Sequence, residues 1–151
     1  MDFNSLAKNC TVEYVGTAVS AANNTDDNSS IVDTADCEGV MFIAPITDSV
    51  AGGVATLTIE QNTVNSGSGM AAIAGSAVAG TSGTNDDLNG KVLITEVIRP
   101  RERYVQAVRT SATQNIAFGD LVAVKFGHRK VPSTDHADVI TKASVTSPAE
   151  A

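Results

Sequence analysis

The segment formed by residues 91–130 constrains the fold more than any other part of the chain. It contains three runs rich in β-branched residues, at 92–98, 104–109 and 116–126, separated by a proline-containing corner and a polar turn. Short apolar runs bounded by such breakers are typical of β-strands. No stretch of the chain repeats apolar residues with the 3.6-residue period of a helix. We therefore predict an all-β protein.

Earlier segments indicate the same fold class. Residues 39–45 form a continuous apolar run between a glycine and a proline, which is typical of a strand buried on both faces. Residues 54–61 alternate with a period of two, as a half-buried strand does, and Ala55, Leu57 and Ile59 share one face. With weaker strands elsewhere, the chain is best described as a β-sandwich or jelly-roll-like fold of about seven to nine short strands.

The length of 151 residues is typical of one domain. We expect an N-terminal arm at 1–10, a β-sandwich domain at 11–130 and an extended C-terminal tail at 131–151. Within the domain, residues 22–30 read as a polar loop. Residues 62–90 are rich in Gly, Ser, Thr and Ala and predict a long excursion with one or two weak strands. Long loops of this kind are usually functional or mobile.

Charge is distributed unevenly along a chain whose formal net charge is −7. Residues 1–90 contain eleven acids and Lys8 as their only base, whereas residues 91–151 contain nine bases and six acids. An acidic chain lacks the sustained positive field that phosphate binding needs, whereas a basic patch that meets an acidic protein surface suits this asymmetry. We therefore expect protein partners and no nucleic acid.

The core is expected to be thin, because aromatic residues make up only 4% of the chain and Trp is absent. Ala and Val bury little area each, so self-association or docking on a partner is expected to add stability. No window approaches the 18 apolar residues of a membrane span, and the N-terminal residues lack the pattern of a signal peptide. We expect synthesis in the cytoplasm, no membrane partner, and free thiols at Cys10 and Cys37, with a single disulfide as the alternative.

No motif for catalysis, a metal or a cofactor stands out. His136 and Asp138, with Asp135 beside them, are a weak candidate for a metal site because they offer one His and two acids in a tail. The Asp pairs at 26–27 and 86–87 lack calcium-loop spacing and read as turns. The glycine runs do not form a strand–loop–helix phosphate cradle. We expect no enzyme activity, no metal and no cofactor.

The most informative feature is the basic corner Arg99-Pro-Arg-Glu-Arg103. In an extended chain Arg99, Arg101 and Arg103 point to one side, where their guanidinium groups can bind carboxylates bidentately. The alternative is a solvated corner whose arginines pair internally with Glu96 or Glu102. Seven of the ten bases lie between residues 99 and 130 and are expected to form one protein-binding patch. These are Arg99, Arg101, Arg103, Arg109, Lys125, Arg129 and Lys130.

Four segments carry a resemblance to a known family: residues 36–44, 46–48, 99–109 and 120–132. In this order and spacing they resemble small structural proteins of tailed bacteriophages and prophages, in particular the capsid decoration (cement) proteins. The similarity extends from about residue 11 to residue 150. It implies a β-sandwich-like subunit bound in many copies to the major capsid protein on the outside of the head, often as a symmetric homodimer or homotrimer. The cysteines at positions 10 and 37 depart from the pattern, so no redox role carries over.

The expected function is therefore that of a non-enzymatic virion protein, located on the capsid surface, that decorates and stabilises a phage capsid by bridging major capsid protein subunits. Two alternatives remain open. A head-surface module that binds the host or a glycan would use exposed aromatic rings, but the two Tyr and four Phe lie mostly in strand patterns. A neck or tail joining component would have the same composition.

Overall fold

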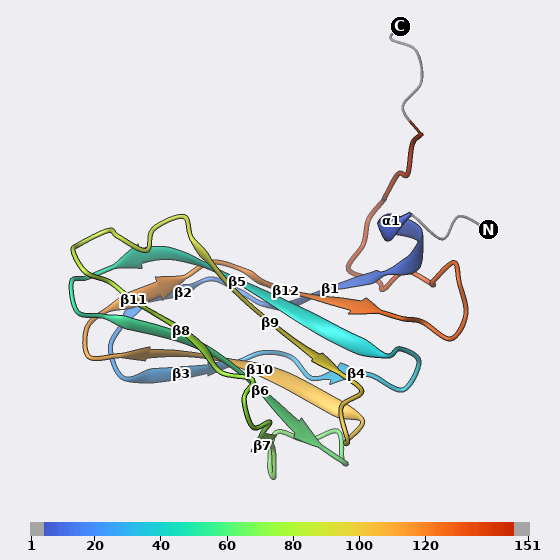
Figure 1. Ribbon diagram of the computed structural model, residues 1–151, viewed down its shortest axis with the longest axis horizontal. Coiled ribbons are helices and arrows are strands. Elements are labelled where there is room, and N and C mark those ends of the chain that lie inside the picture. Colours follow the sequence, from blue (N-terminus) through green and yellow to red (C-terminus); the bar gives the residue numbers. More distant parts are fainter. Residues whose placement is uncertain (1–4, 147–151) are drawn as a thin grey trace, which may run out of the picture.

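The computed structural model describes residues 5–146, so the expectations for residues 1–4 and 147–151 lie outside the described part of the chain. The predicted all-β fold is confirmed: two antiparallel sheets pack face to face as a sandwich (Figure 1). The elements within the described residues are α1 (Leu6–Asn9), β1 (Thr11–Gly16), β2 (Val19–Ala22), β3 (Thr25–Asn28), β4 (Val32–Asp33), β5 (Gly39–Ser49), β6 (Val54–Asn62), β7 (Ala71–Ala72), β8 (Val78–Thr81), β9 (Val92–Ile98), β10 (Tyr104–Ala112), β11 (Ile116–Phe118) and β12 (Leu121–Phe126).

The long strand β5 organises the first sheet. The strands of this sheet follow the order β1-β12-β5-β11-β2, and β9 pairs with the other edge of β5. The second sheet has the order β3-β10-β6-β7, with β4 beside β10 and β8 beside β6. Because β5 pairs with β9, β12 and β11, the apolar run at 39–45 lies at the centre of its sheet, as its sequence predicts. The prediction that both of its faces are buried is wrong, because Met41, Ile43 and Pro45 point away from the second sheet and are only partly buried.

The core lies between the two sheets, where alternate residues of the strands interdigitate. On β5, Val40, Phe42 and Ala44 are fully buried, and the predicted inner face of β6 faces them with Ala55, Leu57 and Ile59, also fully buried. A smaller cluster joins Ile46, Phe118 and Leu88 at one end. The alternation that predicts a half-buried β6 is thus confirmed.

The expected polar loop at residues 22–30 is wrong, because this segment contains all of β3 and the last residue of β2. β3 pairs along β10, and its polar side chains bind across the pair: the hydroxyl of Thr110 donates to the Asp26 carboxylate at 2.7 Å. Backbone pairing and cross-strand hydrogen bonds therefore place Asp and Asn in a strand, which propensity alone disfavours. The predicted continuous strand at 116–126 is also interrupted, at Gly119 and Asp120, so that Leu121, Ala123 and Lys125 face inward.

The excursion at 62–90 folds back onto the second sheet. β7 and β8, the two weak strands that the sequence predicts, both pair with β6, and Leu88 enters the core with 8% of its surface exposed. The described part of the C-terminal tail has no helix or strand. It runs beside α1 and β1, where the backbone N–H of Ser133 donates to the carbonyl of Lys8 at 2.8 Å (Figure 1).

Candidate protein-binding groove

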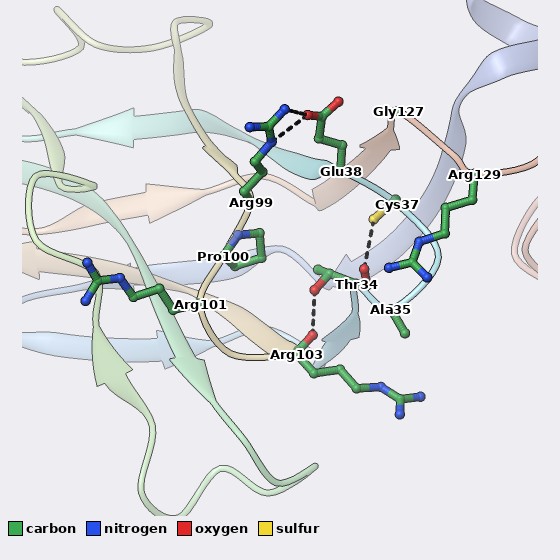
Figure 2. A pocket seen from close by; sticks show the side chains of 10 residues that line it. All are labelled: Thr34, Ala35, Cys37, Glu38, Arg99, Pro100, Arg101, Arg103, Gly127 and Arg129. Atoms are coloured by element: carbon green, nitrogen blue, oxygen red, sulfur yellow. Dashed lines mark hydrogen bonds and ion pairs between the residues drawn. The ribbon is translucent and has the colours of Figure 1, made fainter.

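The basic corner between β9 and β10 lines an open groove of about 760 Å³ at one end of the sandwich (Figure 2). The opposite wall is the loop at residues 34–38 between β4 and β5, and the end of β12 closes the groove. Its lining is Thr34, Ala35, Cys37, Glu38, Arg99, Pro100, Arg101, Arg103, Gly127 and Arg129. Four arginines and one carboxylate thus form a locally positive surface on an acidic chain.

Backbone hydrogen bonds fix the loop at 34–38 to the other walls of the groove. The N–H of Arg99 donates to the carbonyl of Glu38 at 2.7 Å. The carbonyl of Arg103 accepts from both the N–H of Thr34, at 3.0 Å, and its hydroxyl, at 2.7 Å. The N–H of Arg129 donates to the carbonyl of Asp36 at 3.1 Å. The groove is therefore a formed part of the fold, held from three sides.

The arginines of the corner do not share one face, contrary to the prediction from their alternation. Arg99 has a φ of +53°, a left-handed conformation that turns the chain, so residues 99–103 are not extended. Figure 2 shows the side chains of Arg99, Arg101 and Arg103 diverging around the groove. The corner therefore presents its cations in three directions.

Two arginines of the corner have ion-pair partners on the facing segment. Arg99 binds Glu38 with its Nε at 2.8 Å and its Nη2 at 2.7 Å from Oε1. Arg103 binds Asp33 bidentately, at 2.8 and 2.6 Å. Internal pairing was the alternative that the sequence left open, but the partners are Glu38 and Asp33 and not Glu96 or Glu102. Sequence reasoning missed both acids, because they lie 61 and 70 residues from their partners.

These ion pairs are exposed to solvent and therefore exchangeable. The side chains of Arg99 and Arg103 are 81% and 53% exposed. The hydrogen bond to Arg103 lowers the pKa of Asp33, and the same bond raises the pKa of Arg103. Exposed pairs contribute little net stability because water competes for both partners. A carboxylate from another protein can therefore replace the internal one at small cost.

Arg101 and Arg129 are exposed, and neither forms an ion pair with any residue in the range 5–146. Lys130 is exposed as well, and it lies beside Arg129 at a smaller cavity of about 130 Å³ next to the groove. The predicted patch is thus reduced to five residues that reach the surface at this end of the fold: Arg99, Arg101, Arg103, Arg129 and Lys130.

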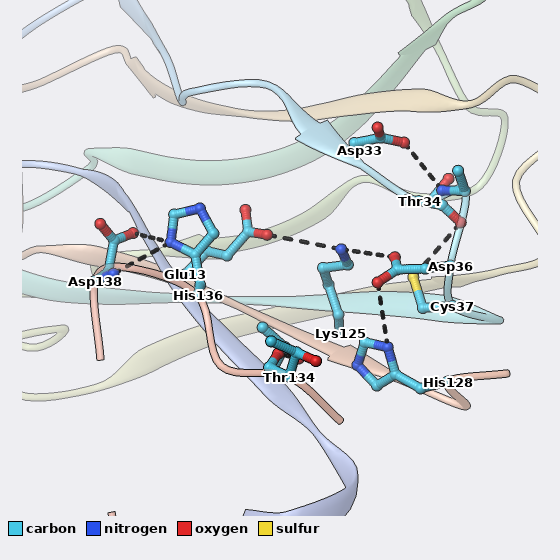
Figure 3. Close-up of polar contacts among 12 residues, drawn as sticks. Glu13, Asp33, Thr34, Asp36, Cys37, Lys125, His128, Thr134, His136 and Asp138 are labelled. Atoms are coloured by element: carbon cyan, nitrogen blue, oxygen red, sulfur yellow. Dashed lines mark hydrogen bonds and ion pairs between the residues drawn. The ribbon is translucent and has the colours of Figure 1, made fainter. Parts of the chain in front are cut away.

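Lys125 is not part of an exposed patch, and its assignment to one is wrong. Its side chain is 8% exposed and points into the sandwich, where Nζ lies 2.8 Å from Asp36 and 3.7 Å from Glu13 (Figure 3). The side chain of His128 is 5% exposed, and its Nδ1 lies 3.6 Å from the other carboxylate oxygen of Asp36. Burial alone would raise the pKa of the Asp36 carboxyl group. The hydrogen bond from Lys125 and its positive charge outweigh this effect, so the pKa of Asp36 is lowered. Through its ion pair with Asp36, Lys125 therefore holds the loop at residues 34–38, which we call the groove loop, against the sandwich.

Arg109 is also buried, with 1% of its side chain exposed, so it too is wrongly assigned to the patch. Its guanidinium group binds Asp27 on β3 of its own sheet and reaches across to the carbonyls of Gly119, at 2.6 Å, and Thr17, at 2.8 Å. Its charge also lies 5.9 Å from the ring of Phe118. Arg109 therefore connects the two sheets and has a structural role.

Cys37 is the nucleophilic side chain in the groove wall, and its sulfur lies 3.7 Å from the carbonyl of Thr34. Burial raises the pKa of its thiol to about 11, so the thiol stays protonated at neutral pH. Burial also raises the pKa of Cys10. Both cysteines are free, which confirms the prediction of two thiols over that of a disulfide.

Two of the candidate metal residues pair with one another, and the third pairs with a lysine. His136 lies 2.9 Å from Asp138, whose carboxylate also accepts the backbone N–H of Tyr14, while Asp135 pairs with Lys142. Across residues 5–146, no three His, Cys, Asp or Glu side chains gather as metal ligands. Over the same residues, no helix has the length and apolarity needed to cross a membrane.

Comparison with known proteins supports the fold. No protein-family model matches the sequence, and no curated protein matches it. Among solved structures, the crystal structure of the PBSX exported protein XepA is similar, with a TM-score of 0.55 and 16% sequence identity. The match covers 97% of this chain and 46% of XepA, so this chain spans about half the length of that protein. At this identity the likeness shows a shared β-sandwich fold.

Proposed function

We propose that this chain is a non-enzymatic structural protein of a bacteriophage virion that decorates the capsid and bridges major capsid protein subunits. Its groove would bind an acidic segment of the capsid protein. The observation that carries the proposal is the groove itself, with four arginines of which Arg101 and Arg129 form no ion pair with any residue between 5 and 146. The shared fold with XepA, a phage-related protein, supports the same setting.

The chemistry of the groove favours carboxylates over other groups. A guanidinium group binds a carboxylate through two parallel hydrogen bonds, and the bonds are stronger because both partners are charged. An acidic segment entering the groove would first meet the unpaired Arg101 and Arg129, and would then compete with Glu38 and Asp33 for Arg99 and Arg103. Each contact is weak, but repetition over a shell would retain the protein through many simultaneous contacts.

The experiment is co-sedimentation of the purified chain with undecorated phage heads. A double charge reversal, Arg101→Glu with Arg129→Glu, should lower the affinity at least about tenfold, because it replaces two attractive contacts by repulsive ones. Each single variant, Arg101→Glu and Arg129→Glu, should also bind more weakly, and their matched control is Lys91→Glu, a single charge reversal at a lysine in the loop before β9 whose side chain is 60% exposed. Binding of the wild type should also weaken with added salt.

Two results would contradict the proposal: a wild-type chain that does not sediment with heads, or a double reversal that binds as well as the wild type. The number of copies bound per head distinguishes a shell protein from a neck or tail joining component, since a shell offers far more sites. Binding to cells or to glycans in place of heads would favour the receptor-binding alternative.

A further inference from the structure

The first sheet carries apolar residues on the face that points away from the core. Outward positions on β12 are Val122, Val124 and Phe126, and those on β5 include Met41, Ile43 and Pro45. The flanking strands continue this surface with Val92, Ile94 and Ile98 on β9 and with Val12 and Tyr14 on β1. Glu96 is the only charged residue at these outward positions. We call this surface the outer face of the first sheet.

The pairing register aligns these residues into continuous rows across four strands. One row runs Tyr14, Val122, Ile43 and Ile94, and the next runs Val12, Val124, Met41 and Glu96. The exposed fractions at the two edges are high: 48% for Ile94, 56% for Ile98 and 44% for Tyr14. An antiparallel sheet that faces water normally places polar residues on that side. This face is therefore built for contact with something other than water.

Polarity is inverted at one pair of positions on β1 and β12. Glu13 and Lys125 point inward and lie 3.7 Å apart, while Val12 and Val124, one residue before each, point outward. The exposed face of the second sheet shows the usual arrangement, since its outward positions include Thr56, Thr58, Glu60, Thr110 and Asp26. The contrast between the two faces of one molecule identifies the face that a partner covers.

We infer that the outer face of the first sheet is a self-association surface, covered by the same face of a second copy of this chain. The charge distribution favours a second copy as the occupant. Two chains of net charge −7 repel one another wherever their acids meet, but among the described residues the acids of this face lie at its margins, Glu96 on β9 and Asp120 beside Tyr14, where their carboxylates can stay solvated. Two apolar sheet faces also stack well, about 10 Å apart, around a twofold axis.

The size of the face defines the kind of dimer. The apolar surface is four strands wide, with about 4.8 Å between strands, and about six residues long, with a rise of about 3.3 Å per residue. Its area is therefore about 400 Å². A standard interface covers about 800 Å² on each partner, so the face alone supplies roughly half. The described parts of the terminal segments lie on the same side of the sheet, beside β1 (Figure 1). They contain Leu6, Ile140 and Val145, whose exposed fractions are 73%, 98% and 74%. They extend the contact, and we expect dissociation in the micromolar range.

Sedimentation velocity and light scattering over about 1 to 200 µM test this inference. The wild type should shift with concentration from 15.5 kDa to twice that mass. Ile94→Glu should abolish the shift, because it places a second carboxylate two residues before Glu96 on the outer face. Thr58→Glu is the matched control, since it places a carboxylate two residues before Glu60 on the outer face of the second sheet, and it should dimerise as the wild type does.

The test remains decisive if one variant folds poorly. Far-UV circular dichroism at low concentration reports folding, and Val12→Glu, on the opposite edge of the face, is the second disrupting variant. A wild-type mass of one or three chains over the whole range would overturn the inference, as would an Ile94→Glu variant that is folded and dimeric. The inference is independent of the proposed function, so the Arg101→Glu, Arg129→Glu chain should still dimerise even though it fails to bind heads.

Discussion

Replacing Arg109 with methionine tests the claim that this residue connects the two sheets. Methionine keeps most of the apolar stem and cannot replace the hydrogen bonds of the guanidinium group. The variant leaves the carbonyl oxygens of Gly119 and Thr17 without their donor, at distances of 2.6 and 2.8 Å in the wild type. It also leaves the Asp27 carboxylate without a cation.

The expected cost follows from these losses. The buried carbonyl of Gly119 loses a charged donor, at a cost of about 1.5–3 kcal/mol, whereas the part-buried carbonyl of Thr17 can bind water and costs less. Asp27 is 38% exposed, so water can solvate part of its charge. Loss of the ion pair with Arg109 therefore costs less stability than loss of a fully buried pair would. Together they lower the free energy of unfolding by about 3–4 kcal/mol, a large share of the stability of a typical domain.

Urea unfolding followed by far-UV circular dichroism measures this loss at one low protein concentration. Arg103→Met is the control, because Arg103 also binds an aspartate bidentately but is 53% exposed. It should unfold close to the wild-type midpoint. An Arg109→Met variant that loses less than about 1 kcal/mol would refute the structural role of Arg109 and reopen its assignment to a binding surface.

Three further predictions concern the groove loop and the excursion. In a Cys10→Ser chain, alkylation of Cys37 should increase with pH around a midpoint near about 11; a mass-spectrometric rate profile centred on the ordinary thiol value of 9.0 would contradict this. The lowered pKa of Asp36 means that its pairing with Lys125 stabilises the fold above the ordinary carboxyl pKa of 3.8 and that this contribution is lost as the pH falls through the lower folded-state value. Between pH 7 and about 3, wild-type urea midpoints should therefore fall more steeply than those of Lys125→Met, and parallel curves would count against the pairing. Leu88→Ala should cost about 2–4 kcal/mol in thermal or urea unfolding, because Leu88 fills the core from the excursion; a loss below about 1 kcal/mol would show that the excursion is not anchored there.

Local sequence patterns predict the parts of this fold in which side-chain periodicity reports burial. The alternation at 54–61 gives the inner face of β6, and the apolar run at 39–45 gives the central strand, since both signals arise from packing against the facing sheet. β3 escapes such reasoning because its Thr-Asp-Asp-Asn sequence has neither signal. Its strand conformation comes from pairing with β10, a strand about 80 residues away, which no local window contains.

The candidate site shows the same limit for charges. The basic corner is visible in the sequence, but the fate of each base depends on acids distant in the chain. Lys125 and Arg109 are buried because Asp36 and Asp27 neutralise them from 89 and 82 residues away. The bend at Arg99, which spreads the arginines around the groove, depends on its bond to Glu38. The prediction that alternating arginines share one face requires an extended chain, and the chain is not extended at Arg99 because of this tertiary contact.

The strand pairing determines the order in which the chain can fold during synthesis. β1 pairs only with β12, β2 only with β11, and β3 and β4 only with β10. The first four strands therefore have no partner until the last quarter of the domain has left the ribosome. Folding is therefore expected to be slow, because the topology is dominated by long-range pairs.

A nascent segment that waits unpaired exposes strand edges to its neighbours and tends to aggregate. Residues 1–36 contain six acids and only one base, Lys8, and this excess of negative charge keeps waiting chains apart. The acidic character of the N-terminal quarter is thus expected to protect the polypeptide before it folds. The charge asymmetry along the chain therefore has a consequence for the unfolded polypeptide as well as for the folded surface.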